Sequence, residues 1–289
     1  MFLFIQIDVT NVLEPLGFFC LGLVASILAM TSGGEGAILF VPAFTFLGLD
    51  PRVCVGTAFV TQFFGKYTGM VSWGTVGHFE KKDVVLWSKL GPLSFFCIIF
   101  LFCGIEAIKH VPKGWINLFF GVTCLVLAVA MACITGKGMR QDFPSIHLVY
   151  PCNLFCLFLA GLFTGMIAVG VGAVTTFMLH ISEDIEYRKS AATAVALLPI
   201  VSLFGIPFYL GLVRWDIAVY TILGVIVGGS IGPWSTTTKK IKWLARVSKF
   251  LHLKAIKKKN LTKALKLIYI GLTLGLGVWM LVFSVRSMI

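Results

Sequence analysis

Long apolar runs separated by short polar segments dominate the chain. The runs at residues 16–30 and 37–49 flank one glycine-rich stretch, Thr31-Ser32-Gly33-Gly34-Glu35-Gly36. Each run is too short to cross a hydrocarbon core of about 30 Å, and the two together are too long for one straight helix. The pattern therefore predicts a helix that breaks inside the membrane, where irregular backbone is tolerated only if it is buried in protein or lines a wet cavity.

About eight apolar segments fill nearly the whole length of 289 residues, and 58% of the residues are hydrophobic. Soluble domains are about 45–50% apolar. We therefore predict an all-α polytopic membrane protein with no soluble catalytic domain. Because residues 1–14 contain no Lys or Arg, they lack the charged region of a cleaved signal peptide, and we expect the first helix to remain as an anchor.

The glycine-rich pattern recurs in the second half of the chain. Residues 165–174 repeat the break, and Ser190-Ala191-Ala192-Thr193-Ala194 repeats Cys54-Val55-Gly56-Thr57-Ala58. We predict two homologous transmembrane repeats, 1–140 and 141–289, each opening with a glycine-broken helix. Transporters built from such repeats place their site at the repeat interface near the bilayer midplane.

The repeats are parallel if each broken helix crosses the membrane and inverted if each turns back. The inverted arrangement places six bases inside (Lys81, Lys82, Lys137, Arg140, Arg188, Lys189) and five outside (Arg52, Lys109, Lys113, Arg214, Arg286). The crossing arrangement reverses this balance, so the positive-inside rule favours inversion by a small margin. Both arrangements place the N- and C-termini outside the cell.

The net charge of +12 is concentrated in one segment, where eleven Lys and Arg residues fall between Lys239 and Lys266 without an acidic residue. Basic loops remain on the inner side of a membrane, so the loop 236–264 is predicted to be cytoplasmic. Apolar residues recur at helical spacing within residues 241–255, which suits a helix lying on anionic lipid headgroups. The alternative is a helix that binds a cytoplasmic partner protein. We expect no nucleic-acid partner, and the oligomeric state is not readable.

No catalytic or metal-binding pattern accompanies these segments. The G-x-S-x-G and H-E-x-x-H motifs are absent, and Gly136-Lys137-Gly138 lacks the spacing of a phosphate loop. Most of the eight cysteines fall inside apolar runs, and the five histidines are scattered. The sequence therefore predicts no enzyme, no cofactor and no metal site.

The broken helices are the candidate site for a small anion. Exposed N–H groups at the N-terminus of a half-helix favour negative charge, and glycine lets the backbone approach a ligand closely. The candidate substrate-binding residues at the two breaks are Thr31, Ser32, Gly33, Gly34, Gly36, Gly170 and Gly172. The alternative is that these glycines only permit close helix packing.

Polar residues continue along one side of the next helix in each repeat. Thr57, Gln62 and Lys66 lie on two adjacent stripes that must face inward, and Thr193 occupies the position of Thr57 in the second repeat. The threonine hydroxyls can bind an oxyanion or bond to the preceding helical turn.

Ionisable groups within a membrane suggest function, and Glu35 with Lys66 is the candidate coupling or gating element. Three interpretations stay open: an ion pair, a proton-accepting Glu35, and side chains that extend to the interface.

These motifs resemble the sulfite exporter TauE/SafE family of membrane anion transporters. The first copy reads Gly33-x-Glu35-Gly36, Val41-Pro42, Leu47-Gly48-Leu49-Asp50-Pro51 and Gly56-Thr57-Ala58, and the second reads Gly170-x-Gly172 and Ala192-Thr193-Ala194. The chain departs from the family pattern at Glu35 and Ala37, where Gly is usual, at Ala58 and Ala194, where Ser is usual, and at Leu179, where the second proline is missing.

The resemblance implies a secondary transporter in the plasma or inner membrane that exports small sulfur-containing anions, such as sulfite or organosulfonates, from the cytoplasm. The residues alone support a membrane carrier with a central polar site. The alternative from another functional class is a non-transporting membrane assembly or regulatory protein whose basic loop binds a partner.

Overall fold

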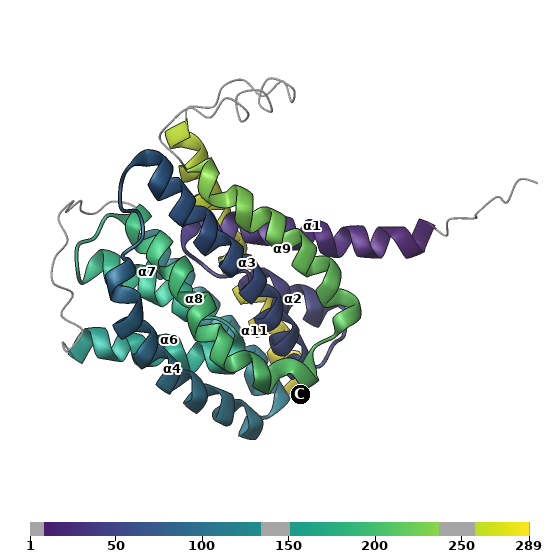
Figure 1. Ribbon diagram of the computed structural model, residues 1–289. Coiled ribbons are helices and arrows are strands. Elements are labelled where there is room, and N and C mark those ends of the chain that lie inside the picture. The colour runs from purple at the N-terminus through teal and green to yellow at the C-terminus, as the bar shows by residue number, and fades with distance from the viewer. Residues whose placement is uncertain (1–8, 134–150, 237–257, 289) are drawn as a thin grey trace, which may run out of the picture.

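The computed structural model describes residues 9–133, 151–236 and 258–288, and the elements in this part of the chain are helices joined by short loops (Figure 1). It contains ten α-helices and one 3-10 turn, η1 (Leu210–Leu212). The helices are α1 (Val9–Ser32), α2 (Ala37–Phe46), α3 (Pro51–Glu80), α4 (Trp87–His110), α5 (Lys113–Cys133), α6 (Pro151–Ile167), α7 (Val171–Ile181), α8 (Tyr187–Tyr209), α9 (Trp215–Ser235) and α11 (Lys258–Met288).

Within these described ranges, six helical stretches are long and apolar enough to cross a membrane, which makes this a multi-pass membrane protein. They are Glu14–Ser32, Trp87–His110, Lys113–Ala132, Tyr187–Leu212, Trp215–Ser235 and Ala264–Arg286. The helix α3 is not among them, although it has 30 residues. Its buried side carries Thr57, Thr61, Gln62 and Lys66, so the predicted inward polar face is confirmed.

Both predicted helix breaks are present. The helix α1 ends at Ser32 and α2 begins at Ala37, while α6 ends at Ile167 and α7 begins at Val171. The helix α2 runs back toward the start of α3, where the Thr45 hydroxyl lies 3.7 Å from the Cys54 sulfur. Each break therefore separates a long helix from a short one of 10 or 11 residues.

The helices α3 and α8 lie side by side in the middle of the bundle and run in opposite directions (Figure 1). At one end Glu80 pairs with Arg188, and at the other end Gly56 lies against Leu212. A side chain on Gly56 would come within 2.9 Å of the Leu212 Cβ. The glycine therefore sets how closely α3 approaches η1, the turn that follows α8.

Three further helix pairs surround this centre. The helix α1 packs along α9 in the same direction, with Gly22 beside Thr221 and Met30 beside Gly232. The helix α4 packs along α6 in the same direction, and Gly161 lies against the Cys97 carbonyl. The helix α5 packs against α11 in the opposite direction, since Ser284 contacts Gly114 and Gly277 lies beside Cys124. Small residues let these helices approach closely. Close packing stabilises the pairs, because in lipid there is no hydrophobic driving force between helices.

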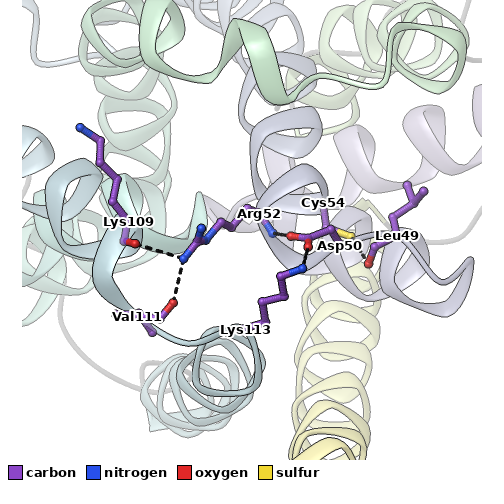
Figure 2. Close-up of polar contacts among 7 residues, drawn as sticks. All are labelled: Leu49, Asp50, Arg52, Cys54, Lys109, Val111 and Lys113. Atoms are coloured by element: carbon purple, nitrogen blue, oxygen red, sulfur yellow. Dashed lines mark hydrogen bonds and ion pairs between the residues drawn. The ribbon is translucent and has the colours of Figure 1, made fainter.

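Polar contacts join the loops at one end of the bundle (Figure 2). Arg52 donates to the carbonyls of Lys109 (3.1 Å) and Val111 (3.2 Å), where α4 ends. Asp50 caps α3 by accepting from the Arg52 N–H (3.0 Å) and pairs with the Lys113 ammonium. Partial burial alone would raise the pKa of Asp50, but the hydrogen bonds from Lys113 and the Arg52 amide outweigh it and hold the pKa below its ordinary value.

The opposite end of α3 is also tied to a neighbour. Residues 78–83 read as a polar loop in the sequence, but α3 continues through Glu80. The Glu80 carboxylate accepts two hydrogen bonds from Arg188, at 2.7 and 3.2 Å, and its side chain is 2% exposed. A bidentate arginine partner stabilises a carboxylate that would otherwise favour a solvated loop. Arg188 is therefore engaged in an ion pair.

Three predictions fall outside the described residues: the boundary between the repeats at 140/141, the bases Lys137 and Arg140, and the membrane-surface helix at 241–255.

Candidate functional site at the two helix breaks

The two breaks lie against each other in the interior of the bundle, although they are more than 130 residues apart in the chain. The Thr176 hydroxyl on α7 donates to the Gly33 carbonyl in the first break at 3.2 Å. Gly33 has φ +68°, and a side chain there would come within 2.6 Å of the Thr176 hydroxyl and 2.7 Å of Ala191. Glycine is therefore required at this position for both its backbone conformation and the close contact.

The Glu35 carboxylate crosses from the first break to the second and binds the N-terminus of α7. One oxygen accepts from the Gly170 N–H at 2.7 Å, and the other accepts from the Gly172 N–H at 2.5 Å. The residue has no exposed surface. A carboxylate at this position satisfies amides that have no partner within the helix and interacts favourably with the positive end of the helix dipole.

Lys66 and Tyr269 hold the backbone of the first break from the other side. The Lys66 ammonium donates to the Gly34 carbonyl. The Tyr269 hydroxyl accepts from the Glu35 N–H at 2.9 Å and lies 3.2 Å from the Glu35 carbonyl oxygen. Both side chains are buried. The backbone around Glu35 is therefore fixed by two helices that are distant in sequence, α3 and α11.

Glu35 and Lys66 meet at the same break, because the Lys66 ammonium donates to the carbonyl of Gly34, but the direct ion pair considered from the sequence is not formed. Among the described residues the ion pairs involve other groups. The reason is geometric: the carboxylate turns toward the α7 amides, and the ammonium turns toward a carbonyl of the break. Neither side chain extends to the membrane surface, because both are buried.

Gln62 connects the polar side of α3 to the second break. Its amide nitrogen donates to the Ala168 carbonyl at 2.8 Å, and Ala168 has φ +58°, which is unusual for a residue other than glycine. One turn of α3 therefore contacts both breaks, through Gln62 and Lys66. In the described part of the chain, the buried hydroxyls of Thr61 on α3 and Ser202 on α8 have no hydrogen-bond partner.

Thr57 and Thr193 have matching structural roles at opposite ends of the α3 and α8 pair. The Thr57 hydroxyl accepts from the Arg214 N–H (3.1 Å) just before α9, and the Thr193 hydroxyl accepts from the Leu86 N–H (3.1 Å) just before α4. Thr193 also donates to the Lys189 carbonyl of the preceding turn (2.7 Å). These two hydroxyls bond to the chain itself, and each ties one half of the molecule to a helix start in the other half.

Thr31 and Ser32 also direct their hydroxyls to the protein backbone. Thr31 donates to the carbonyl of Leu28 at 3.0 Å, and Ser32 donates to the same carbonyl at 2.7 Å. The Ser32 oxygen accepts from the Gly34 N–H at 3.3 Å. These contacts stabilise the end of α1 and the turn into the break.

The remaining glycines of the candidate set permit close contact. A side chain on Gly34 would come within 2.2 Å of the Tyr269 hydroxyl, and one on Gly36 within 2.9 Å of the Phe40 ring. One on Gly172 would come within 2.9 Å of Glu35 Cγ. The packing interpretation of these glycines therefore has direct support, and Gly170 and Gly172 additionally present their amides to an anionic group.

The space around the breaks is filled in this conformation. A cavity of about 10 Å³ lies between Gly36, Gln62 and Lys66, which is at the limit for one water molecule. A much larger groove of about 540 Å³ lies at the junction of α3 and α4, beside Trp73, Lys81 and Lys82. Because the cavity at the breaks is so small, entry of a solute of several heavy atoms needs a change of conformation.

Two contributors to the site were missed from the sequence. Tyr269 contacts Glu35, and the Tyr187 hydroxyl donates to the Ser32 carbonyl. Tyr269 lies in the last apolar run, where a hydroxyl needs a buried partner, and this was the available signal. The sequence contained no indication that the partner is the first break.

Comparisons with known proteins agree with this architecture. The family model described as sulfite exporter TauE/SafE matches residues 18–253, a range that includes both breaks. Searches of curated proteins and of solved structures found no match to the chain. Because the family model covers most of the chain, the protein belongs to the sulfite exporter TauE/SafE family, whose members are membrane transporters of sulfite and related anions.

Proposed function

We propose that this protein is a secondary transporter that exports small sulfur-containing anions, sulfite or organosulfonates, from the cytoplasm, and that the anion binds between the two helix breaks. The observation that carries this proposal is the meeting of the two breaks around a buried ammonium group, Lys66, and the first amides of α7. Backbone amides at a helix start and a nearby cation together favour a small oxyanion.

The directions of the helices support an inverted repeat, with α1–α5 in the first copy and α6–α11 in the second. The equivalent helices α3 and α8 are antiparallel, as are α5 and α11. The packing of α1 on α9 has its counterpart in the packing of α6 on α4. Since α2 runs back to the start of α3, α1 and α2 form a re-entrant pair in this proposal, and α6 and α7 form the other.

The distribution of charge supports an orientation with both termini outside. Contacts gather Arg52, Lys109 and Lys113 at one end of the bundle. The other end holds Lys81, Lys82 and Arg188. Lys266, which follows the basic loop, also lies there, with its ammonium 4.0 Å from the centroid of the Tyr187 ring. We assign this second end to the cytoplasm, because the basic loop 236–264 attaches there and basic loops remain inside. Anionic headgroups are the expected neighbours of that loop.

Flux measurements in proteoliposomes test the function. Wild-type protein should exchange radiolabelled sulfite, and excess unlabelled sulfite should inhibit the exchange. Lys66→Met should reduce the flux at least about tenfold, since about 1.4 kcal/mol of lost anion stabilisation has that effect. Lys109→Met is the matched control, because this lysine is on the surface, with a side chain 55% exposed. The flux of this variant should equal that of wild type.

A folded protein that carries no small anion would refute the proposal and favour the non-transporting assembly protein. The same assay with sulfonates in place of sulfite identifies the substrate. Imposed pH gradients then identify whether protons drive export.

A further inference from the structure

We propose that the Glu35 carboxylate is a tethered anion that occupies the substrate's own binding site on α7, so that Glu35 and the transported anion exclude each other. The inference rests on the proposed transport function and adds to it a residue that controls access to the site. Glu35 then sets both the affinity for the anion and the conformation in which the anion can bind.

The geometry of the carboxylate is that of a bound oxyanion. Its two oxygens accept from the amides of Gly170 and Gly172, at 2.7 and 2.5 Å. These are the amides to which the sequence assigned an anion. Glycine at position 172 is needed for this contact, because a side chain there would come within 2.9 Å of Glu35 Cγ. The site therefore binds two oxygens of one group through two amides of the same helix start, those of Gly170 and Gly172. Sulfite and sulfonates also present two oxygens on one group.

The buried charge of Lys66 gives independent support for a ligand site. Lys66 is 1% exposed, and its hydrogen-bond acceptor is a neutral carbonyl, that of Gly34. The acidic residue at this break is Glu35, which follows Gly34 in the chain and is also fully buried. A buried ammonium of this kind requires an anion nearby, so departure of the Glu35 carboxylate leaves a cationic site ready for another anion.

The absence of free volume makes the exclusion mutual. The cavity beside Lys66 measures about 10 Å³, too small for an oxyanion of several heavy atoms. The anion can enter only when the Glu35 side chain leaves its amides. Because Glu35 belongs to the first break and its amides to the second, this exchange removes one of the contacts that hold the two breaks together.

Anion rescue of a variant that lacks the carboxylate tests the inference on the purified full-length protein. Glu35→Ala vacates the α7 amides and leaves Lys66 without its counter-ion, so the variant should unfold at a lower temperature than wild type. Added formate should restore several degrees of its Tm, because formate supplies the missing carboxylate. Sulfite should bind Glu35→Ala at least about tenfold more tightly than wild type, equal to about 1.4 kcal/mol.

Glu35→Gln is the second variant, for use if the alanine variant does not fold, because the amide keeps the volume of the side chain and removes only the charge. Its sulfite affinity should also exceed that of wild type. The matched control is Glu106→Ala, which removes a surface carboxylate whose side chain is 62% exposed. Formate should leave its Tm unchanged, and its sulfite affinity should equal that of wild type.

The results separate this inference from the proposed function. Formate rescue of Glu35→Ala without sulfite binding by either protein would support the anion site and contradict sulfite as the substrate. Wild-type sulfite flux, with variants that bind sulfite no more tightly than wild type and are not rescued by formate, would support transport and overturn the tethered anion.

Discussion

Replacing Gly172 with alanine tests the contact between the two breaks most directly. A methyl group at this position would lie 2.9 Å from Glu35 Cγ, 3.1 Å from Glu35 Oε1 and 3.2 Å from the Gly33 carbonyl. Contacts below about 3.4 Å are closer than carbon atoms pack at optimal separation. The Glu35 side chain and the Gly33 carbonyl must both shift, and the 2.5 Å hydrogen bond from the Gly172 N–H lengthens.

The magnitude follows from three effects. Overpacking by one methyl group costs about 1–3 kcal/mol, and a weakened hydrogen bond to a charged group costs up to about 1.5–3 kcal/mol. The higher helix propensity of alanine offsets about 1 kcal/mol. We therefore expect Gly172→Ala to lower the free energy of unfolding by about 1.5–5 kcal/mol, by the same sum of estimates.

Denaturant unfolding in detergent, followed by tryptophan fluorescence, measures this difference. Gly271→Ala in α11 is the matched control, because no atom lies within 4 Å of the position that its methyl group would take. It should be neutral or stabilising by up to about 1 kcal/mol. Equal stability of the two variants would show that the breaks do not pack as described and would refute the reasoning.

Three further predictions concern the ends of the bundle. Arg188→Ala should lower the free energy of unfolding by about 3–5 kcal/mol, because Glu80 is buried and loses its bidentate partner. The double variant Glu80→Gln/Arg188→Met should recover most of this loss in the same unfolding assay. Thr57→Val and Thr193→Val should each cost about 1 kcal/mol of stability and leave the sulfite affinity unchanged, and a large loss of affinity in binding measurements would contradict their structural role. The pKa of Asp50 is lowered in the folded protein, so its charged form stabilises the fold at neutral pH. This contribution is lost as the pH falls below the ordinary value of 3.8 and through the lowered pKa. Asp50→Asn should remove this acid-dependent part of the unfolding free energy, measured as Tm against pH.

The sequence by itself determined the class of the protein and the positions of its two breaks. Run lengths and glycine clusters are local signals, and they are decisive in a bilayer, because unpaired backbone is not tolerated in lipid. The inward polar side of α3 followed in the same way from i, i+4 spacing. The polar residues 78–83 read as a loop, but α3 continues through Glu80, because its last turn depends on the partner of Glu80.

Only the tertiary structure decided what each buried polar group contacts. Glu35 binds amides 135 and 137 residues away, and no periodicity within one helix specifies such a partner. The same holds for Thr57 and Thr193, whose shared motif suggested a shared ligand but whose hydroxyls bind the helix starts of the opposite half. The physical reason is that in a helical membrane protein the backbone satisfies itself locally, whereas side-chain partners depend on which helices become neighbours.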